Sequence, residues 1–213
     1  MRLNRKKPKT TRAALLKDCV NLVGRSAPCL LIFLTLASLA AVPRPSHASQ
    51  QDEFQEYQLK AAFLYNFAKF ITWPSNAFPT ANAPLTIGIL GEDPFKELLS
   101  DVLLDKTVGG RQLAIKHFKA GDVVEGCQLL FISRSEKERA ASTLASLQGK
   151  SILTVSEFDH FANQGGMINL IVVDKSVRFE INPETAEKAR LKISSKLGSM
   201  GIVVKTEPSP RNQ

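Results

Sequence analysis

The sequence YQLKAAFLYNFAKFITWP, at residues 57–74, places most of its large apolar side chains along one side of a helix. These residues recur three and four positions apart, the spacing of a single helical face. Leu64 and Ala68 widen the apolar stripe until only Lys60 and Lys69 are expected to require water. A helix this apolar must be covered, so the rest of the chain or a partner has to supply an apolar surface.

Two interpretations of this helix stay open: it is a core helix, or one face is core while another docks on a ligand or a protein. We expect Phe63, Phe67 and Phe70 in the core. Tyr65 or Trp73 is expected nearer the surface, and these two are the candidate partner-binding residues.

The first 48 residues have the pattern of a secretory signal peptide. A basic leader is followed by an apolar run at residues 29–42 and by Ser46-His47-Ala48, with small residues at the two positions that signal peptidase inspects. We predict cleavage after Ala48 and a periplasmic location; an uncleaved membrane anchor is the alternative, although the run is short for a membrane span.

Removal of this leader changes the charge. The whole chain has a net charge of +8, but nine of its 28 Lys and Arg and one of its 20 Asp and Glu lie in the first 48 residues. The remainder holds 19 residues of each sign and is neutral. Without a basic excess to contact phosphates, nucleic-acid binding is not expected.

Cysteine content excludes an internal disulfide in the mature chain, because Cys19 and Cys29 belong to the leader and only Cys127 stays. We expect Cys127 to be a buried structural thiol; an intermolecular disulfide or a reactive thiol is the alternative.

Residues 49–206 are predicted to form one α/β domain of three layers, with a mostly parallel, mixed sheet of about six strands flanked by helices and preceded by the aromatic helix. Residues 75–84 are expected to be a linker, and residues 207–213 a disordered tail. The predicted strands span residues 85–90, 112–118, 129–132, 151–155, 167–173 and 177–181, the last two forming an antiparallel pair. The first two predicted helices span residues 95–103 and 135–147, the second starting with a capping box at Ser135. A short helix is predicted after Ser156. The last predicted helix is capped by Asn182 and has an apolar stripe from Ala186 to Leu197.

Catalytic, metal-binding and phosphate-binding motifs are not found, so the chain is not expected to be an enzyme or to hold a metal or cofactor. Arg178 and Glu180 alternate with apolar residues on their strand, so a charged pair on a covered face would need each other or a polar ligand. Arg111, which follows two glycines, is a second candidate contact for an anion. These three are the candidate ligand-binding residues; a mutually paired or solvated role is the alternative.

Several segments together resemble one family of periplasmic regulators, the YfiR family: LKAAFLYNFAKFITWP (59–74), LTIGILGEDPF (85–95), GGRQL (109–113), CQLLFIS (127–133), ILTVSEF (152–158), GGMINL (165–170), VRFEIN (177–182) and LKISSKL (191–197). The resemblance implies a compact α/β domain. It also implies a protein that represses an inner-membrane diguanylate cyclase through the cyclase's periplasmic part, and that is itself sequestered by an outer-membrane lipoprotein of the YfiB type. The output in such a system is cyclic-di-GMP and biofilm formation.

The leading hypothesis is therefore a non-catalytic periplasmic signalling regulator that binds an inner-membrane diguanylate cyclase or sensor kinase. A periplasmic small-ligand sensor or carrier is the competing hypothesis, because α/β sheets often bind ligands at their strand ends. Whether the protein forms a homodimer is left open by the sequence.

Overall fold

A computed structural model describes residues 47–206 of the chain. The predicted leader lies outside these residues except for His47 and Ala48, and the predicted tail lies wholly outside them. In the described part, no helix combines the length and the apolar character that crossing a membrane would require.

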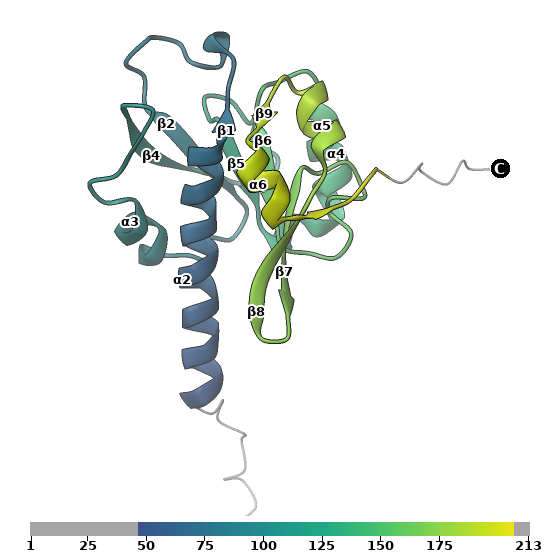
Figure 1. Cartoon of the computed structure of the whole chain (residues 1–213). Helices are drawn as coiled ribbons and strands as arrows, with labels where there is room; N and C mark the ends of the chain where they lie inside the picture. Colours follow the sequence, from purple (N-terminus) through teal and green to yellow (C-terminus); the bar gives the residue numbers. More distant parts are fainter. Residues whose placement is uncertain (1–46, 207–213) are drawn as a thin grey trace, which may run out of the picture. The chain divides into compact units, whose positions relative to one another are not determined.

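The chain forms an α/β domain around an eight-stranded mixed sheet, which confirms the predicted fold class (Figure 1). The strands lie in the order β10-β8-β7-β6-β5-β2-β4-β3. Their bounds are β2 Leu85–Leu90, β3 Thr107–Val108, β4 Arg111–Phe118, β5 Leu129–Ile132, β6 Leu153–Ser156, β7 Ile168–Val173, β8 Ser176–Ile181 and β10 Ile202–Val203. Strands β4, β2, β5, β6 and β7 run parallel, whereas β8 is antiparallel to β7, as expected.

The helices cover both faces of this sheet. They are α2 (His47–Phe70), α3 (Glu97–Leu103), α4 (Ala140–Ser146), α5 (Pro183–Lys188) and α6 (Ser195–Met200). Alternate strand residues point to opposite faces: Ile87 and Phe131 pack in one cluster with α2 and α3, whereas Leu130 packs in another with α4. The central strands are therefore apolar on both faces, as a buried parallel sheet requires.

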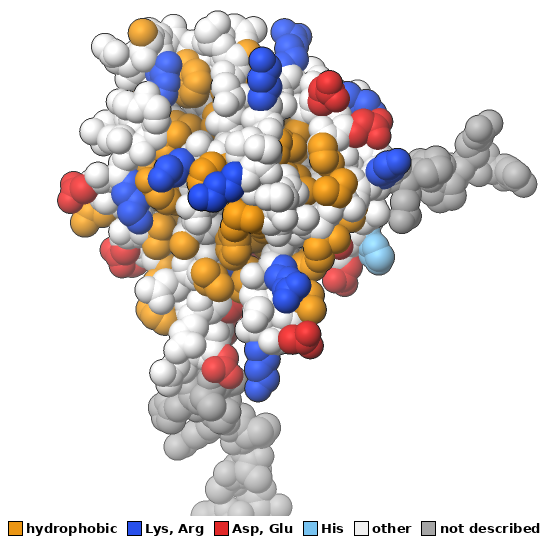
Figure 2. Space-filling view, viewed as in Figure 1, with side chains coloured by type: hydrophobic (Ala, Val, Ile, Leu, Met, Phe, Trp, Pro, Cys, Tyr) orange, Lys and Arg blue, Asp and Glu red, His pale blue; other side chains and the backbone are white. Residues whose placement is uncertain are grey.

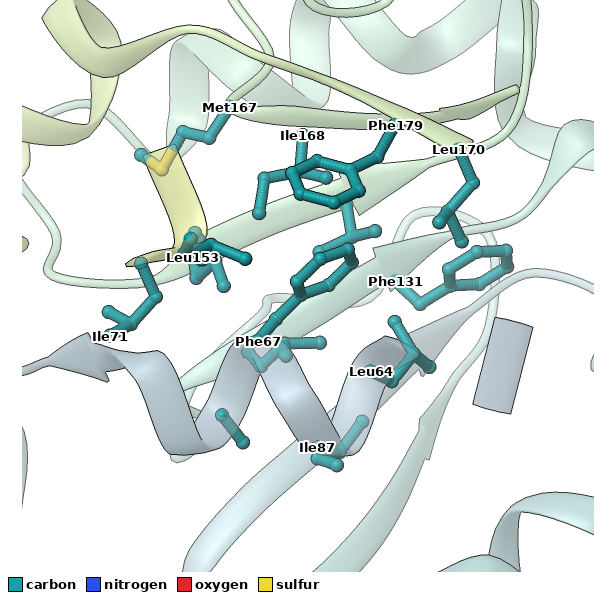
Figure 3. Close-up of a cluster of buried hydrophobic side chains, with 14 of the residues drawn as sticks. Leu64, Phe67, Ile71, Ile87, Phe131, Leu153, Met167, Ile168, Leu170 and Phe179 are labelled. Atoms are coloured by element: carbon teal, nitrogen blue, oxygen red, sulfur yellow. The ribbon is translucent and has the colours of Figure 1, made fainter. Parts of the chain in front are cut away.

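Helix α2 supplies the centre of the larger cluster. Ala61, Leu64, Phe67 and Ala68 are completely buried against the sheet. Figure 3 shows Leu64 and Phe67 pointing from the helix toward strand residues, and the Phe67 ring lies 5.1 Å from that of Phe179 in an edge-to-face contact. The prediction that Phe67 is core is confirmed, while Phe63 and Phe70 are only half-buried.

Two expectations about the aromatic stretch are wrong. Lys60 does not reach water: its side chain is 2% exposed and is paired inside the protein. The helix also ends at Phe70, because Ile71 begins the short strand β1 (Ile71–Thr72), which pairs with β9 (Lys192–Ile193) in a separate two-stranded sheet.

Three predicted helices also differ from the structure. The segment predicted at residues 135–147 is a 3-10 helix, η3 (Arg134–Arg139), followed by α4, and Ser135 does not cap it because its hydroxyl accepts a hydrogen bond from the Glu92 amide. Residues after Ser156 form turns instead of a short helix. The predicted last helix is two helices: Asn182 caps α5 as expected, but Arg190 adopts a positive φ, and β9 separates α5 from α6.

The β7–β8 hairpin extends beyond the rest of the sheet. Strand β6 pairs only with Ile168 and Asn169 of β7, and β10 pairs only with Glu180 and Ile181 of β8. Among the described residues, positions 170–173 and 176–179 therefore form a two-stranded ribbon, closed by Asp174 and Lys175, both with positive φ. The hairpin is thus present as expected, but its turn has two residues instead of the predicted three at 174–176, because Ser176 already pairs with Val173.

Candidate functional site

The inner face of α2 is fixed to the sheet by a buried group of polar side chains. Lys60 forms ion pairs with Glu56, one helical turn earlier, and with Glu157, whose side chain is also 2% exposed. The Tyr57 hydroxyl donates to Glu157 Oε1 over 3.0 Å. A buried charge is stable only when it is paired and hydrogen-bonded, and here both conditions are met.

Glu157 directly follows β6 and lies at the carboxyl edge of the parallel sheet. Arg134, just after β5, donates from its guanidinium to the Glu157 carbonyl over 3.1 Å. Burial first, and then the nearby Glu157 carboxylate, raises the pKa of the Tyr57 hydroxyl above its ordinary value. The group therefore keeps Tyr57 protonated and ties α2 to the ends of two neighbouring strands.

The opposite side of α2 is open to solvent. Each residue of a helix is rotated by about 100° from the one before it, which places four residues along this side. We call this side the outer face of α2, and its residues are Leu59, Ala62, Asn66 and Lys69. Leu59 is 46% exposed, Lys69 is exposed, and Ala62 and Asn66 are half-buried. The two middle residues, Ala62 and Asn66, are smaller than Leu59 and Lys69 at the ends of this face.

Apolar side chains are also exposed on neighbouring elements. Phe54, near the start of α2, is 54% exposed, and Val172 on the β7–β8 ribbon is 50% exposed. Helix α2 contacts the ribbon through the rings of Phe63 and Phe179, whose centroids are 5.7 Å apart. Figure 2 shows hydrophobic side chains gathered where α2 and the ribbon lie next to each other. Exposed apolar surface of this kind is typical of protein interaction sites.

The structure separates the two aromatic residues predicted to bind a partner. Tyr65 is half-buried on the flank of the outer face, with the Lys106 ammonium 4.9 Å from its ring centroid. Trp73 is also half-buried, but its indole N–H donates to the Gln128 carbonyl over 3.0 Å. Trp73 therefore makes a structural contact that joins the segment after α2 to the residue just before β5.

The predicted ligand-binding residues do not come together. Arg178 and Glu180 share one face of β8, whereas Arg111 lies on β4, with β7, β6, β5 and β2 between the two strands. The Arg111 guanidinium donates to the carbonyls of Thr80 and Ala83 and lies 3.8 Å from the Phe78 ring centroid. These contacts hold the linker before β2 and engage the Nη1 group of the guanidinium.

Glu180 has a polar neighbour that the sequence did not reveal. Asn169 lies opposite Glu180 in the β7–β8 register and donates to Glu180 Oε2 over 3.0 Å. Asn169 is 1% exposed, and its side-chain oxygen has no hydrogen-bond partner among the described residues. A buried acceptor without a donor is uncommon and marks a place where a further donor would be favourable.

The crevice where α/β sheets often bind ligands is filled by the chain itself. The strand order reverses between β2 and β5, and Gly91 follows β2 at this point. A Cβ atom at Gly91 would lie 2.8 Å from Glu136 Cγ and would also collide with Ser135 Oγ. Glu136 is buried, and both its oxygens accept hydrogen bonds from Arg139. Side chains of η3 thus occupy the usual ligand position.

The remaining reactive groups are few. Cys127 is buried and free, and burial raises the pKa of its thiol to about 11, so the thiolate is scarce near neutral pH. Within residues 47–206, no group of three or more His, Cys, Asp or Glu side chains could hold a metal ion. We therefore take the outer face of α2, with the exposed apolar side chains on neighbouring segments, as the candidate recognition surface.

A family model described as YfiR/HmsC-like matches residues 57–201, which begin within α2 and end just after α6. No match was found among curated proteins.

The buried pair generates a prediction about stability. We expect Lys60→Met and Glu157→Gln each to lower the free energy of unfolding, by about 3 to 5 kcal/mol for the lysine change. Lys60→Met leaves the buried Glu157 carboxylate without its ammonium partner, whereas Glu157→Gln leaves the buried Lys60 with only its ion pair to the partly exposed Glu56. The free energy of unfolding of the double variant, measured by urea unfolding, should fall by less than the sum of the decreases in the two single variants.

Lys188→Met is the matched control, since its ion pair with Glu184 is 70% and 56% exposed and should contribute little. Equal losses for Lys60→Met and Lys188→Met would show that the buried group does not hold α2.

Proposed function

The chain belongs to the YfiR/HmsC-like family, and we propose that it is a non-catalytic periplasmic regulator of a membrane signalling protein. Its target is the periplasmic part of an inner-membrane protein, most simply a diguanylate cyclase, which it represses. The family match over residues 57–201 is the observation that carries this proposal, because it covers the described domain from α2 to α6.

The predicted leader supports the location. A chain exported to the periplasm and cleaved after Ala48 would keep the whole of α2 except its first two residues. Such a protein can reach the outer side of the inner membrane, where the sensory part of a cyclase or kinase is exposed. A lipoprotein of the YfiB type would then compete for the same regulator.

The partner docks on the outer face of α2. Three features of the structure support this assignment. The inner face is fixed by the buried Lys60–Glu157 pair, Leu59 on the outer face is exposed, and apolar side chains are also exposed on neighbouring segments at Phe54 and Val172. A rigid helix loses little conformational freedom on binding, so it is a favourable docking element.

This proposal predicts the effect of gene deletion in the native host. Cyclic-di-GMP should rise when the gene is removed and should fall again when the wild-type gene is restored, because the cyclase loses and then regains its repressor. The measurement is cyclic-di-GMP in cell extracts, and an unchanged level after deletion would contradict the function.

Two variants locate the docking surface in the same assay. Ala62→Trp adds bulk to the outer face of α2 and should fail to restore the low level. Ala141→Trp makes the same change at an exposed site on α4 and should restore it. Thermal unfolding of both purified variants controls for misfolding.

A small-ligand sensor is a second candidate, favoured by the unpartnered side-chain oxygen of Asn169. The acceptors of Asn169 and Glu180 suit an amine, and the exposed Arg178 on the same face suits a carboxylate. Amino acids added at a hundred times their dissociation constant should stabilise the protein by about 2.7 kcal/mol in thermal unfolding. Arg178→Gln should reduce this gain, and the absence of any gain with amino acids would rule the candidate out.

A further inference from the structure

Three lysine ammonium groups lie across the carboxyl half of α2, and each is placed over an aromatic ring of the helix. Lys196 of α6 and Lys69 of α2 lie 5.3 and 5.9 Å from the ring centroid of Phe70. Lys106, before β3, lies 4.9 Å from the ring centroid of Tyr65. Around the helix axis Lys69 falls between the two rings, so the three form a row over the outer face, which we call the lysine row.

The lysine row carries uncompensated positive charge. None of Lys69, Lys106 and Lys196 forms an ion pair with another residue of the described chain, whereas Lys60 and Lys188 do. Figure 2 shows basic side chains following one another across the carboxyl half of α2 and α6, with the acidic side chains of this view outside the row. Residues 49–213 contain equal numbers of basic and acidic residues. The lysine row is therefore a local cluster of positive charge and does not result from an excess of basic residues in this part of the chain.

The aromatic rings hold these lysines in place. A lysine stem that lies on a ring keeps its ammonium group in water, and the ring face attracts the cation. Phe70 and Tyr65 are themselves half-buried and belong to the periphery of the core cluster. The three ammonium groups of the lysine row therefore face solvent, while the rings of Phe70 and Tyr65 pack toward the core.

We propose that the lysine row binds an acidic segment of the partner protein, an inference that rests on the proposed function. Oppositely charged surfaces at an interface speed association and reject wrong partners. Carboxylate groups can contact the three ammoniums while apolar residues of the partner cover Leu59, which is exposed on the same face. An anionic membrane is the less suitable occupant, because the half-buried rings cannot enter lipid and the neutral domain has little long-range attraction to it.

Charge reversal tests this proposal in the full-length exported protein. The variant Lys69→Glu/Lys106→Glu/Lys196→Glu inverts the row. The matched control, Lys119→Glu/Lys137→Glu/Lys205→Glu, changes the net charge equally at exposed lysines elsewhere. A third variant with glutamine at the three row positions serves if the inverted row impairs folding, which thermal unfolding would reveal.

The first measurement is amide NMR during titration with a decaglutamate peptide. Wild type and the control should show shifts around Lys69, Lys106 and Lys196 that weaken as salt is added, and the row variants should bind roughly tenfold more weakly. Equal weakening in the control would show unspecific charge attraction and overturn the proposal. Binding to vesicles of phosphatidylglycerol and phosphatidylethanolamine without binding to the peptide would overturn it in favour of a membrane.

The second measurement is cyclic-di-GMP in the deletion strain. The control should restore repression and the row variants should not. If deletion raises cyclic-di-GMP and all variants restore repression, the lysine row is not the contact, although the regulator function stands. If deletion has no effect, the proposed function itself fails.

Discussion

The buried pair of Lys60 and Glu157 is the interaction on which the placement of α2 depends. The Lys60 side chain is 2% exposed, and a charged group so deeply buried is strongly destabilising unless a carboxylate pairs with it. Among the described residues, Glu56 and Glu157 supply the carboxylates that pair with Lys60. Glu157 in turn follows β6 at the edge of the sheet. Apolar packing alone would allow α2 to slide or rotate on the sheet. The ion pair between Lys60 and Glu157 forms in only one position of the helix, so it fixes the register of α2 on the sheet.

The fixed placement of the inner face determines which residues lie on the outer face of α2. Leu64, Phe67 and Ala68 are buried in the core, so the residues on the other side, apart from Leu59, are small, polar or basic. Lysines from the loop before β3 and from α6 join Lys69 there because the aromatic flanks of α2 hold their stems. In the proposed function, the same helix is one layer of the fold and also the surface that contacts the partner.

Much of the fold could be predicted because the central strands are short apolar runs bounded by turn residues. The strands Leu85–Leu90 and Leu129–Ile132 have the predicted bounds. Lys60 was misjudged because helical periodicity assigns an ammonium group to water, and its partner lies 97 residues away. Ser135 was misjudged in the same way, since its hydroxyl bonds to Glu92 instead of to its own helix. The lysine row could not be predicted, because it assembles from three separate segments.

The central claim is that α2 meets the membrane partner with its outer face. Site-specific photocrosslinking in the native host tests this directly, with the crosslinking amino acid placed at Asn66 on the outer face or at Ser142 on α4, an exposed position across the sheet. The account predicts a crosslinked product with an inner-membrane signalling protein from Asn66 and none from Ser142. A product from Ser142 and none from Asn66 would contradict it.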